Sequence, residues 1–312
     1  MANKELLDVI IIGGGPAGLS AALVLGRARK RVVVIDEGKP RNAVTQEAHG
    51  FLTRDGIRPS ELRRLAMEDI SRYPSVSFVR HAVTGITGAD GHFQASTSEG
   101  EVLAAKKLLF AVGMKDRPLD IPGLAEVYGK SAFVCPYCDG WELRDEPLVI
   151  INSGPELMHF APIISGWSNR LTFCTHGPDG LTDEQREELG RHQIPLHTSP
   201  IRAIDSRDGI VQQVLLEDGT VIPCRGIFFK PDLVPGSDLP QQLGCEISDT
   251  GVVAVDMLGM VGATNVPGIY SAGDIASRMH QAIAAASMGS LTAASINSQL
   301  NLEAWQSQGT SQ

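Results

Sequence analysis

The sequence predicts an α/β protein that contains two copies of a nucleotide-binding module. Short apolar runs with strand character alternate with stretches of helical periodicity along the chain. A glycine-containing turn joins a strand to a helix near the start, and a related turn follows another strand near the middle. The spacing from Gly15 to Gly154 equals the spacing from Arg31 to Arg170, and such a constant offset indicates an internal duplication. The pattern therefore predicts two Rossmann-like modules, each built of three layers in the arrangement ββα.

The first copy predicts a strand at residues 8–12, a tight turn, a helix, and a second strand at 31–35 that ends at Asp36. The three glycines of the turn are Gly13, Gly15 and Gly18. At this spacing they allow a sharp turn, a close approach to a pyrophosphate and tight helix packing. Asp36 stands where a carboxylate can accept a hydrogen bond from a ribose hydroxyl. We therefore predict a nucleotide site here, against the alternative of a ligand-free glycine turn.

The remaining elements follow from periodicity and turn residues. The first copy continues with a loop at 40–58, a helix from 59 with Leu62, Leu65, Ala66 and Ile70 on one side, strands at 76–79, 82–87, 92–97 and 108–113, and a linker at 117–123. The second copy predicts strands at 148–151, 170–174 and 226–229, a helix from Thr182 to near Gly190, and hairpin turns at 207–209 and 217–219. The tail predicts a strand at 252–256 and a strand, loop and helix from 264 onward, outside the second copy.

The most reactive feature of the chain is the pair Cys135 and Cys138, spaced C-x-x-C. Such a pair can close a small disulfide ring and open it again, which suits it to carrying an electron pair. Asp139 follows the second sulfur, where a carboxyl group can exchange the accompanying proton. The alternative for Asp139 is a helix-capping carboxylate. The other cysteines, Cys174, Cys224 and Cys245, lie in apolar or turn contexts, so we expect buried, inert thiols and no metal site.

Length and composition exclude several classes of protein. A chain of 312 residues suffices for about two domains, and its 43% hydrophobic content is that of a globular protein. The 27 basic and 36 acidic residues give a net charge of −9, which disfavours nucleic acid as a partner. No run approaches the ~18 apolar residues of a membrane span. The N-terminus leads directly into a strand and leaves no room for a secretory signal, and five cysteines with one close pair indicate a cytoplasmic protein.

Taken together, the motifs resemble those of the low-molecular-weight thioredoxin reductases, within the pyridine-nucleotide disulfide oxidoreductases. The resemblance covers nearly the whole chain and rests on Gly13–Gly18 with Asp36, Ala111–Gly113, Cys135–Gly140 and Tyr270–Asp274, in that order. It implies an FAD domain assembled from residues 1–116 and 245–312. A redox-ring domain at 117–244 would then be inserted into it, so that the second Rossmann-like domain interrupts the first. A homodimer is also expected from the family.

The resemblance also implies roles for individual residues. Asp274 would hold the ribitol of FAD, and Gln281 and Ala282 would open a helix whose positive end faces the flavin N1/O2 edge. Cys138 would lie against the flavin, Cys135 would attack the substrate disulfide, and Asp139 would be the acid and base. The full set of cofactor-binding residues is Gly13, Gly15, Pro16, Ala17, Gly18, Asp36, Glu37, Ala111, Gly113, Gly273, Asp274, Gln281 and Ala282.

The second nucleotide turn departs from the family pattern. Reductases of this family bind NADPH there through G-x-G-x-x-A/G and a following basic cluster, whereas Asn152 and Leu157 replace the outer two positions here. Thr175 stands at the position equivalent to Asp36, and the next arginine is Arg186. Each missing charge-assisted hydrogen bond costs ~1.5–3 kcal/mol. We therefore predict that NADPH is not the main donor and that reduced ferredoxin or a second flavin replaces it. The opposing interpretation is that neighbouring residues compensate and NADPH still binds.

Three functions remain open from the sequence. The leading one is an FAD-dependent enzyme that passes electrons through the ring to a thioredoxin-like protein or a small disulfide. The segment His49–Gly56 and the ring also resemble a sub-branch that includes dithiol oxidases of sulfur-containing natural products. Members of that sub-branch tend to carry histidine after the second cysteine, so Asp139 favours a reductase. The third is a flavoprotein scaffold without activity, which the intact ring disfavours.

Overall fold

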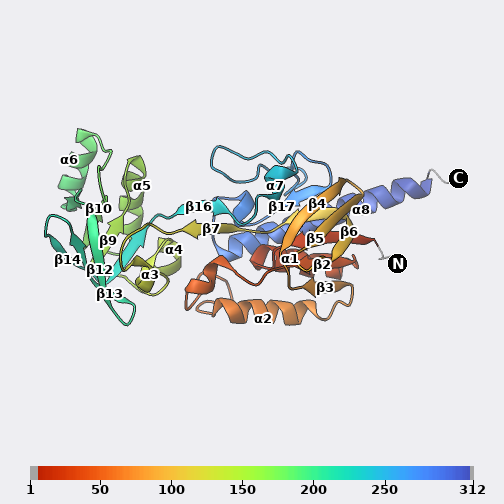
Figure 1. Cartoon of the computed structure of the whole chain (residues 1–312), viewed down its shortest axis with the longest axis horizontal. Coiled ribbons are helices and arrows are strands. Elements are labelled where there is room, and N and C mark those ends of the chain that lie inside the picture. The colour runs from red at the N-terminus through yellow and green to blue at the C-terminus, as the bar shows by residue number, and fades with distance from the viewer. Residues whose placement is uncertain (1–5, 310–312) are drawn as a thin grey trace. The chain divides into compact units, whose positions relative to one another are not determined.

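The computed structural model describes residues 6–309 and divides the chain into two compact units (Figure 1). Within these residues, the first unit comprises the chain up to Ala43, Gly50–Lys115 and the chain from Val234 onward. The second unit comprises Val44–His49 and Asp116–Leu233. The return to the first unit thus comes before residue 245, where the sequence placed it; the assignment of functional domains stays a prediction. Residues 1–5, which bear on the expectation about secretion, lie outside the described part.

The first unit is built on a seven-stranded sheet with the order β3-β2-β1-β6-β5-β4, in which β17 also pairs with β6. The strands are β1 (Leu7–Ile12), β2 (Val32–Ile35), β3 (Val76–Val79), β4 (Val83–Ala89), β5 (His92–Thr97), β6 (Val102–Phe110) and β17 (Ile269–Ser271). The pairs among β3, β2, β1, β6 and β17 are parallel, while β4, β5 and β6 pair antiparallel. The apolar runs of β1 and β2 are buried because both faces of a parallel sheet are covered.

Two helices that lie far apart in the sequence meet at the start of the first one. The helical elements of this unit are α1 (Pro16–Arg27), the short 3₁₀ helix η1 (Arg41–Val44), α2 (Pro59–Ile70), α7 (Leu239–Gln242), the 3₁₀ helix η2 (Asp274–Ala276) and α8 (Ala282–Gly309). A Cβ added to Gly289 of α8 would lie 2.0 Å from the carbonyl oxygen of Ala17 in α1. Glycine is therefore required at Gly289 for α8 to approach α1 this closely, and the contact ties the tail to the N-terminal turn.

The second unit repeats the plan of the first and confirms the predicted duplication. Its five-stranded sheet has the order β11-β10-β9-β15-β8, all parallel, and matches β3-β2-β1-β6-β17 strand for strand. The strands of the unit are β8 (Ala132–Phe133), β9 (Leu148–Ile151), β10 (Leu171–Cys174), β11 (Leu196–His197), β12 (Ile201–Arg207), β13 (Ile210–Leu216), β14 (Val221–Pro223) and β15 (Gly226–Phe229). Its helices are α3 (Leu124–Val127), α4 (Pro136–Asp139), α5 (Pro155–Ile164) and α6 (Asp183–Arg191).

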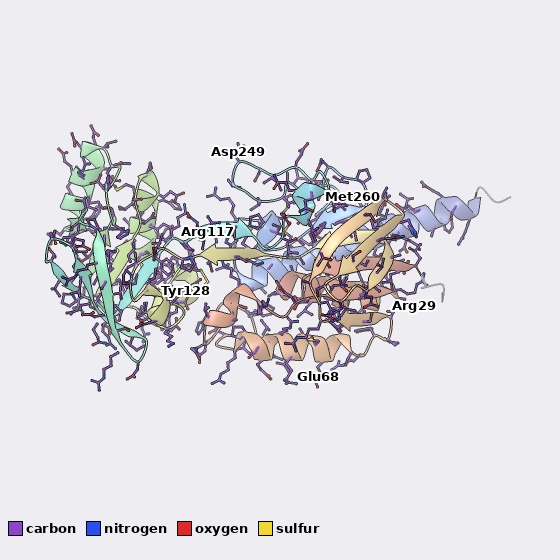
Figure 2. All side chains as sticks on the ribbon, viewed as in Figure 1. Arg29, Glu68, Arg117, Tyr128, Asp249 and Met260 are labelled. Carbon is purple, nitrogen blue, oxygen red and sulfur yellow. A yellow bond between two sulfur atoms is a disulfide. The ribbon has the colours of Figure 1, made fainter. Side chains whose placement is uncertain are left out.

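Alternating side chains of β9 divide the second unit into three layers. Leu148 and Ile150 face a cluster that includes Leu157 and Ile164 of α5, so this face is covered by a helix. Their neighbours along the strand face a second cluster, which the three-stranded sheet β12-β13-β14 covers. On this side Tyr128, labelled in Figure 2, packs edge-on against Phe229 with ring centroids 5.3 Å apart. The predicted ββα layering is thus present.

Two sequence expectations differ from the fold. The strand expected at 252–256 does not form, because Val253 pairs with Ile247 only as an isolated bridge while its own amide donates to the carbonyl of Ile275. The linker expected at 117–123 begins later than predicted, since Met114–Arg117 forms β7. β7 pairs with β16 (Asp232–Pro235), and both passages of the chain between the units run through this two-stranded sheet.

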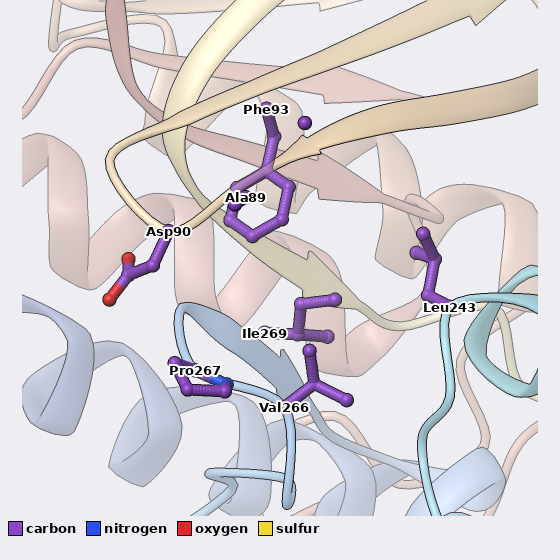
Figure 3. A pocket seen from close by; sticks show the side chains of 8 residues that line it. Ala89, Asp90, Phe93, Leu243, Val266, Pro267 and Ile269 are labelled. Carbon is purple, nitrogen blue, oxygen red and sulfur yellow. The ribbon is translucent and has the colours of Figure 1, made fainter.

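A pocket of about 270 Å³ in the first unit is mostly apolar (Figure 3). Phe93, Leu243, Val266 and Ile269 line it, and the carboxylate of Asp90 points away from them in the figure. That carboxylate is bound 2.6 Å from the ammonium of the buried Lys107, which also contacts Glu303 of α8. Because the polar group at the rim is already paired, the pocket offers no convergent polar set to a ligand. Within residues 6–309, no helix is long and apolar enough to cross a membrane.

Candidate functional site

The predicted nucleotide turn forms where β1 meets α1, and two of its glycines are sterically required. The amide of Gly13 donates to the carbonyl of Ile35 at 2.8 Å, which holds the turn between β1 and β2. Gly13 has φ of +105°, and a Cβ there would lie 2.3 Å from the carbonyl oxygen of Ala111. A Cβ on Gly18 would lie 1.9 Å from the carbonyl oxygen of Gly13. The turn therefore packs against both the helix and β6.

Gly15 differs, because a Cβ added there would meet no atom within 4 Å. It is the residue before α1, and Pro16 and Ala17 form the first turn of that helix. The packing of the protein does not require glycine here, so this position at a helix N-terminus leaves open space, a cradle in which a pyrophosphate could approach the backbone. Gly113, at the end of β6, has φ of +62° and likewise has open space at its Cβ position.

The carboxylate of Asp36 is held firmly at the end of β2. One oxygen accepts from the amide of Gly14 at 2.6 Å, and the other accepts from the amide of Gly38 at 2.8 Å and from Arg63 of α2 at 2.6 Å. Since a carboxylate oxygen takes about two hydrogen bonds, the first oxygen can accept one more. A ribose hydroxyl could use that capacity. Glu37 is exposed and lies 3.2 Å from Lys39, away from this network.

The tail brings a second set of predicted residues to the same turn. A Cβ on Gly273 would lie 2.9 Å from the Cβ of Ala17, so the segment that leads to Asp274 lies against the start of α1. The carboxylate of Asp274 lies 3.5 Å from Arg41, which in turn lies 3.1 Å from His280. Gln281 accepts the first hydrogen bond of α8 through its carbonyl, and Ala282 begins that helix. The carboxyl ends of β1, β2, β6 and β17 thus gather the predicted FAD residues at one edge.

These residues fit FAD. The open position at Gly15, the remaining acceptor capacity of Asp36 and the half-buried carboxylate of Asp274 match a pyrophosphate, a ribose and a polyol. The N-terminus of α8 adds a positive end near Asp274 that would favour an anionic ring system. Each of these features belongs to the first unit.

Two alanine variants should separate cofactor binding from folding. In Gly18→Ala the added Cβ would lie 1.9 Å from a backbone oxygen, so we expect the free energy of unfolding to fall by about 1–3 kcal/mol. In Gly15→Ala, φ is −80° and space is open, so the stability of the apoprotein should change by less than about 0.5 kcal/mol while flavin content falls. Urea denaturation and flavin absorbance measure the two effects. Full flavin content in Gly15→Ala would argue against the cradle.

The redox pair lies at the carboxyl end of β8, where Cys135 precedes α4. Cys135 and Cys138 are disulfide-bonded with Cα atoms 5.3 Å apart, and both residues are half-buried. The amides of Cys138 and Asp139 donate to the carbonyl of Cys135, which closes the turn of α4. Because β8 occupies the place in its sheet that β17 holds in the first unit, the ring stands where Asp274 stands in the other copy.

The side chain of Trp167 packs against the turn that carries Cys135 and Cys138. A Cβ on the buried Gly140 would lie 2.8 Å from the indole of Trp167, so only glycine lets the ring segment pack on that side chain. Trp167 also packs at right angles to Tyr137, with ring centroids 5.3 Å apart. Tyr137 and Trp141 themselves are each 65% exposed and flank the ring sequence. The disulfide segment therefore packs on Trp167, and it exposes two aromatic side chains of its own, Tyr137 and Trp141.

Asp139 has the strongest functional signature among the carboxylates of this unit. Burial and, after it, the charge of Glu142 raise the pKa of Asp139 from 3.8 to about 7, while the charge of His49 acts in the opposite direction. A carboxyl group with a pKa near neutrality can both give and take a proton at working pH. The predicted acid and base therefore has the protonation behaviour that the role requires, which a capping carboxylate does not need.

Asp139→Asn should reveal this proton in two measurements. We expect the exchange between the reduced pair and a disulfide to slow by about 10²-fold and to lose its pH dependence near 7. In the wild type, the folded state keeps the Asp139 proton to about pH 7 whereas the unfolded state loses it near 3.8. Stability should therefore fall as pH rises through this interval, and the variant should lack that slope. An unchanged rate profile would remove Asp139 from the reaction.

A loop of the same unit is hydrogen-bonded to the second glycine turn. Gly154, with φ of +72°, precedes α5 as predicted, but its amide donates to the carbonyl of Asp179 at 2.7 Å. Arg186 clamps the carboxylate of Asp179 with two hydrogen bonds of 2.8 and 3.1 Å, which fixes the loop. The buried Thr175 points its hydroxyl at the backbone carbonyls of its own loop and of β11. The amide of Gly154 and the hydroxyl of Thr175 are therefore already engaged, although a Cβ on Gly154, like one on Gly15, would meet no atom within 4 Å.

The packing of Leu157 also distinguishes the second glycine turn from the first. It occupies the position equivalent to Gly18 and is completely buried between α5 and the sheet. The first copy has no room for one added carbon at this position, whereas the second accommodates a whole leucine side chain. The helix and the turn of the second copy are therefore spaced for packing and not for the close approach seen in the first.

The three remaining cysteines are buried, as expected. Cys174 and Cys224 are at most 3% exposed, and burial raises the pKa of each thiol to about 12. Cys245 is 5% exposed, and burial raises its pKa as well. In the part of the chain that the structure describes, no group of three His, Cys, Asp or Glu side chains is placed to hold a metal ion.

Several residues of these sites had no sequence signal. Arg63 reaches Asp36, and Arg41 reaches Asp274, across 27 and 233 positions of the chain. His49 lies 3.6 Å from Glu142, which brings the segment Val44–His49 to the ring. No local pattern predicts such pairings because they depend on how distant segments fold. A capping box, by contrast, was readable, and Thr182 caps α6 as predicted.

Comparisons with known proteins agree with the fold and with the presence of a disulfide oxidoreductase site. Residues 7–289 match the pyridine nucleotide-disulphide oxidoreductase family. The chain is 32% identical over 305 residues to thioredoxin reductase aclD of Aspergillus oryzae, covering 95% of this chain and 96% of that protein. The structure superposes on a putative thioredoxin reductase, TrxB, of Bacillus anthracis with a TM-score of 0.90 and 37% identity, covering 95% of this chain and 99% of the other. It superposes on HlmI with a TM-score of 0.92 and 34% identity, covering 99% and 98%. The chain therefore belongs to the pyridine nucleotide-disulphide oxidoreductase family, as a thioredoxin-reductase-like flavin disulfide oxidoreductase.

Proposed function

We propose that the protein is an FAD-dependent enzyme that passes an electron pair to the Cys135–Cys138 disulfide and from there to the disulfide of a thioredoxin-like protein. The observation that carries the proposal is a half-buried disulfide followed directly by a carboxyl group whose pKa lies near 7. The chemistry that bound FAD supplies is the transfer of an electron pair. The first unit would hold FAD through Gly13–Gly18, Asp36 and Asp274, and the second unit would carry the ring.

The exchange with the partner needs only three residues of the chain, Cys135, Cys138 and Asp139. The Cys135 thiolate attacks one sulfur of the partner disulfide, and the partner thiolate that leaves takes the proton of Asp139. The Cys138 thiol gives its proton to Asp139, and the resulting thiolate attacks the Cys135 sulfur. The ring closes and the second partner thiolate leaves. Two electrons thus pass from the pair to the partner, and Asp139 ends protonated as it began.

The electron donor in this proposal is not a pyridine nucleotide. Two observations support this. The amide of Gly154, which NADPH would use, already donates to Asp179, and the side chains of Leu157 and Thr175 are buried. Reduced ferredoxin, or a second flavin in the second unit, are the donors that we propose in its place. The alternative of an NADPH-dependent thioredoxin reductase with a non-standard site requires the 176–181 loop to move away from Gly154.

The second candidate is a dithiol oxidase that takes electrons from a small dithiol and returns them to oxygen. A closed nucleotide turn favours it, because such an enzyme draws its electrons from the substrate and needs no nucleotide donor. A small dithiol could meet the exposed Tyr137 and Trp141 beside the ring. We further propose a homodimer that works in the cytoplasm, without nucleic acid as a partner.

The decisive experiment offers the protein both kinds of substrate. The flavin content per chain is measured first, and the flavin is then reduced chemically without oxygen. We expect new thiols on a thioredoxin-like protein, counted with a thiol reagent, at the rate at which the flavin is reoxidised. Peroxide release in air with a small dithiol, and no thiols on the thioredoxin-like protein, would replace the leading proposal by the oxidase. A colourless protein would end both.

A further inference from the structure

The segment Val44–His49 belongs to the second unit although the chain on both sides of it belongs to the first. It packs closely there, since a Cβ on Gly129 would lie 2.3 Å from the carbonyl oxygen of Val44. Its last residue, His49, places Nε2 3.6 Å from Oε1 of Glu142. Glu142 follows Asp139 by three residues, in the turn that comes after α4. The segment Val44–His49 thus brings an imidazole to the carboxylate of Glu142, three residues after Asp139.

We propose that Glu142 and His49 are positioning residues that act on the exchange reaction through Asp139, with opposite signs. Glu142 keeps the proton on Asp139 by repelling a second negative charge, and the positive charge of a protonated His49 acts against this by favouring the ionised carboxylate. This proposal rests on the proposed function, in which Asp139 moves the proton of thiol–disulfide exchange. It adds two residues that set the pH at which the exchange runs.

The surroundings of Asp139 define which charges matter. Burial is the largest influence on its pKa, Glu142 is the next and raises it, and His49 lowers it. Glu47 lies 3.7 Å from His49, and its side chain is 58% exposed against 42% for Glu142. Only the charge of Glu142, and not that of Glu47, shifts the pKa of Asp139. The sulfurs of the ring do not titrate while they are disulfide-bonded. In the oxidised protein, Glu142 and His49 are therefore the charged groups that shift the pKa of Asp139, beside the larger effect of burial.

The test is the titration of Asp139 in the oxidised holoprotein, followed by carboxyl carbon NMR with labelled aspartate, with Asp139→Asn to assign the signal. Glu142→Gln is expected to lower the midpoint by about one pH unit, and His49→Gln to raise it by a similar amount. The double variant should return close to the wild-type midpoint near 7. Glu47→Gln is the matched control, since it removes the exposed carboxylate on the same imidazole, and it should leave the midpoint in place.

Opposite shifts cannot come from a general loss of structure, which would move both variants the same way. Shifts in the same direction, or shifts no larger than that of Glu47→Gln, would overturn the proposal. The pH profile for exchange between the reduced pair and a thioredoxin-like disulfide is the second readout. It should move with each NMR midpoint, and a profile that stays in place would also overturn the proposal. Failure of the proposed function itself would appear differently, as exchange that persists without the ring.

Discussion

Cys138→Ser is expected to abolish disulfide turnover while leaving the flavin bound and reducible. The ring stores an electron pair as two thiols, and one sulfur alone cannot return that pair by closing a disulfide. Cys135 would remain able to attack a partner, but the mixed disulfide would have no internal thiol to resolve it. We therefore expect turnover to fall by about 10³-fold or more. Steady-state thiol release, flavin absorbance and mass spectrometry of the trapped partner measure these effects.

Cys245→Ser is the matched control for this variant. Cys245 is a buried thiol outside the ring, and its sulfur lies 3.7 Å from the hydroxyl of Thr264, so a serine hydroxyl keeps a hydrogen-bond partner. Its turnover should equal that of the wild type. Turnover that persists in Cys138→Ser would show that the ring is not the relay, and it would remove the proposed route.

Stoichiometric NADPH or NADH is expected to leave the flavin oxidised in the absence of oxygen. The amide of Gly154 is bonded to Asp179, Leu157 fills the space beneath the turn, and no charged group stands at Thr175. Losing two charge-assisted contacts would weaken binding by roughly 10²-fold or more. The measurement is an anaerobic titration followed at the flavin absorbance band, with reduced ferredoxin and a small dithiol tested in parallel.

Chemical reduction provides the control, because it must bleach the same flavin completely. Rapid bleaching by one equivalent of NADPH would reverse this conclusion and restore a pyridine-nucleotide site. Two flavins per chain would instead support a second flavin in the second unit. Asp179→Ala offers a further comparison, since it frees the 176–181 loop from Arg186; NADPH reduction that appears only in this variant would identify the loop as the barrier.

Much of the fold was predictable from local patterns. The strand, glycine turn and helix at Gly13–Gly18 and the duplicate at Gly154 formed as expected, and so did the capped start of α6 at Thr182. These features depend on backbone conformation and on the alternation of apolar residues, which neighbouring residues decide. The strand expected at 252–256 failed, because the amide of Val253 found its partner in Ile275 and not in an adjacent strand. A run of apolar residues cannot specify such a partner.

Some features of the candidate site were likewise predictable from the sequence, and others were not. Cys135, Cys138 and Asp139 were evident from their order, and the glycines from their spacing. Their charged neighbours were not, since Arg63 reaches Asp36 and His49 reaches Glu142 from other segments. The closure of the second turn was evident only in part. Asn152 and Leu157 indicated a changed site, but the hydrogen bond between Gly154 and Asp179 requires a folded loop.

The sequence by itself determined the kind of module, its duplication and the candidate residues for the exchange of electrons and protons. It could do so because glycine turns, C-x-x-C spacing and hydrophobic periods act over a few residues at a time. Only the tertiary structure decided which distant charges meet at Asp36 and Asp139 and whether the second turn stays open. Those outcomes depend on where long loops cross the ends of strands, and hydrogen bonds and charges act strongly only between groups that the folded chain brings within a few ångströms.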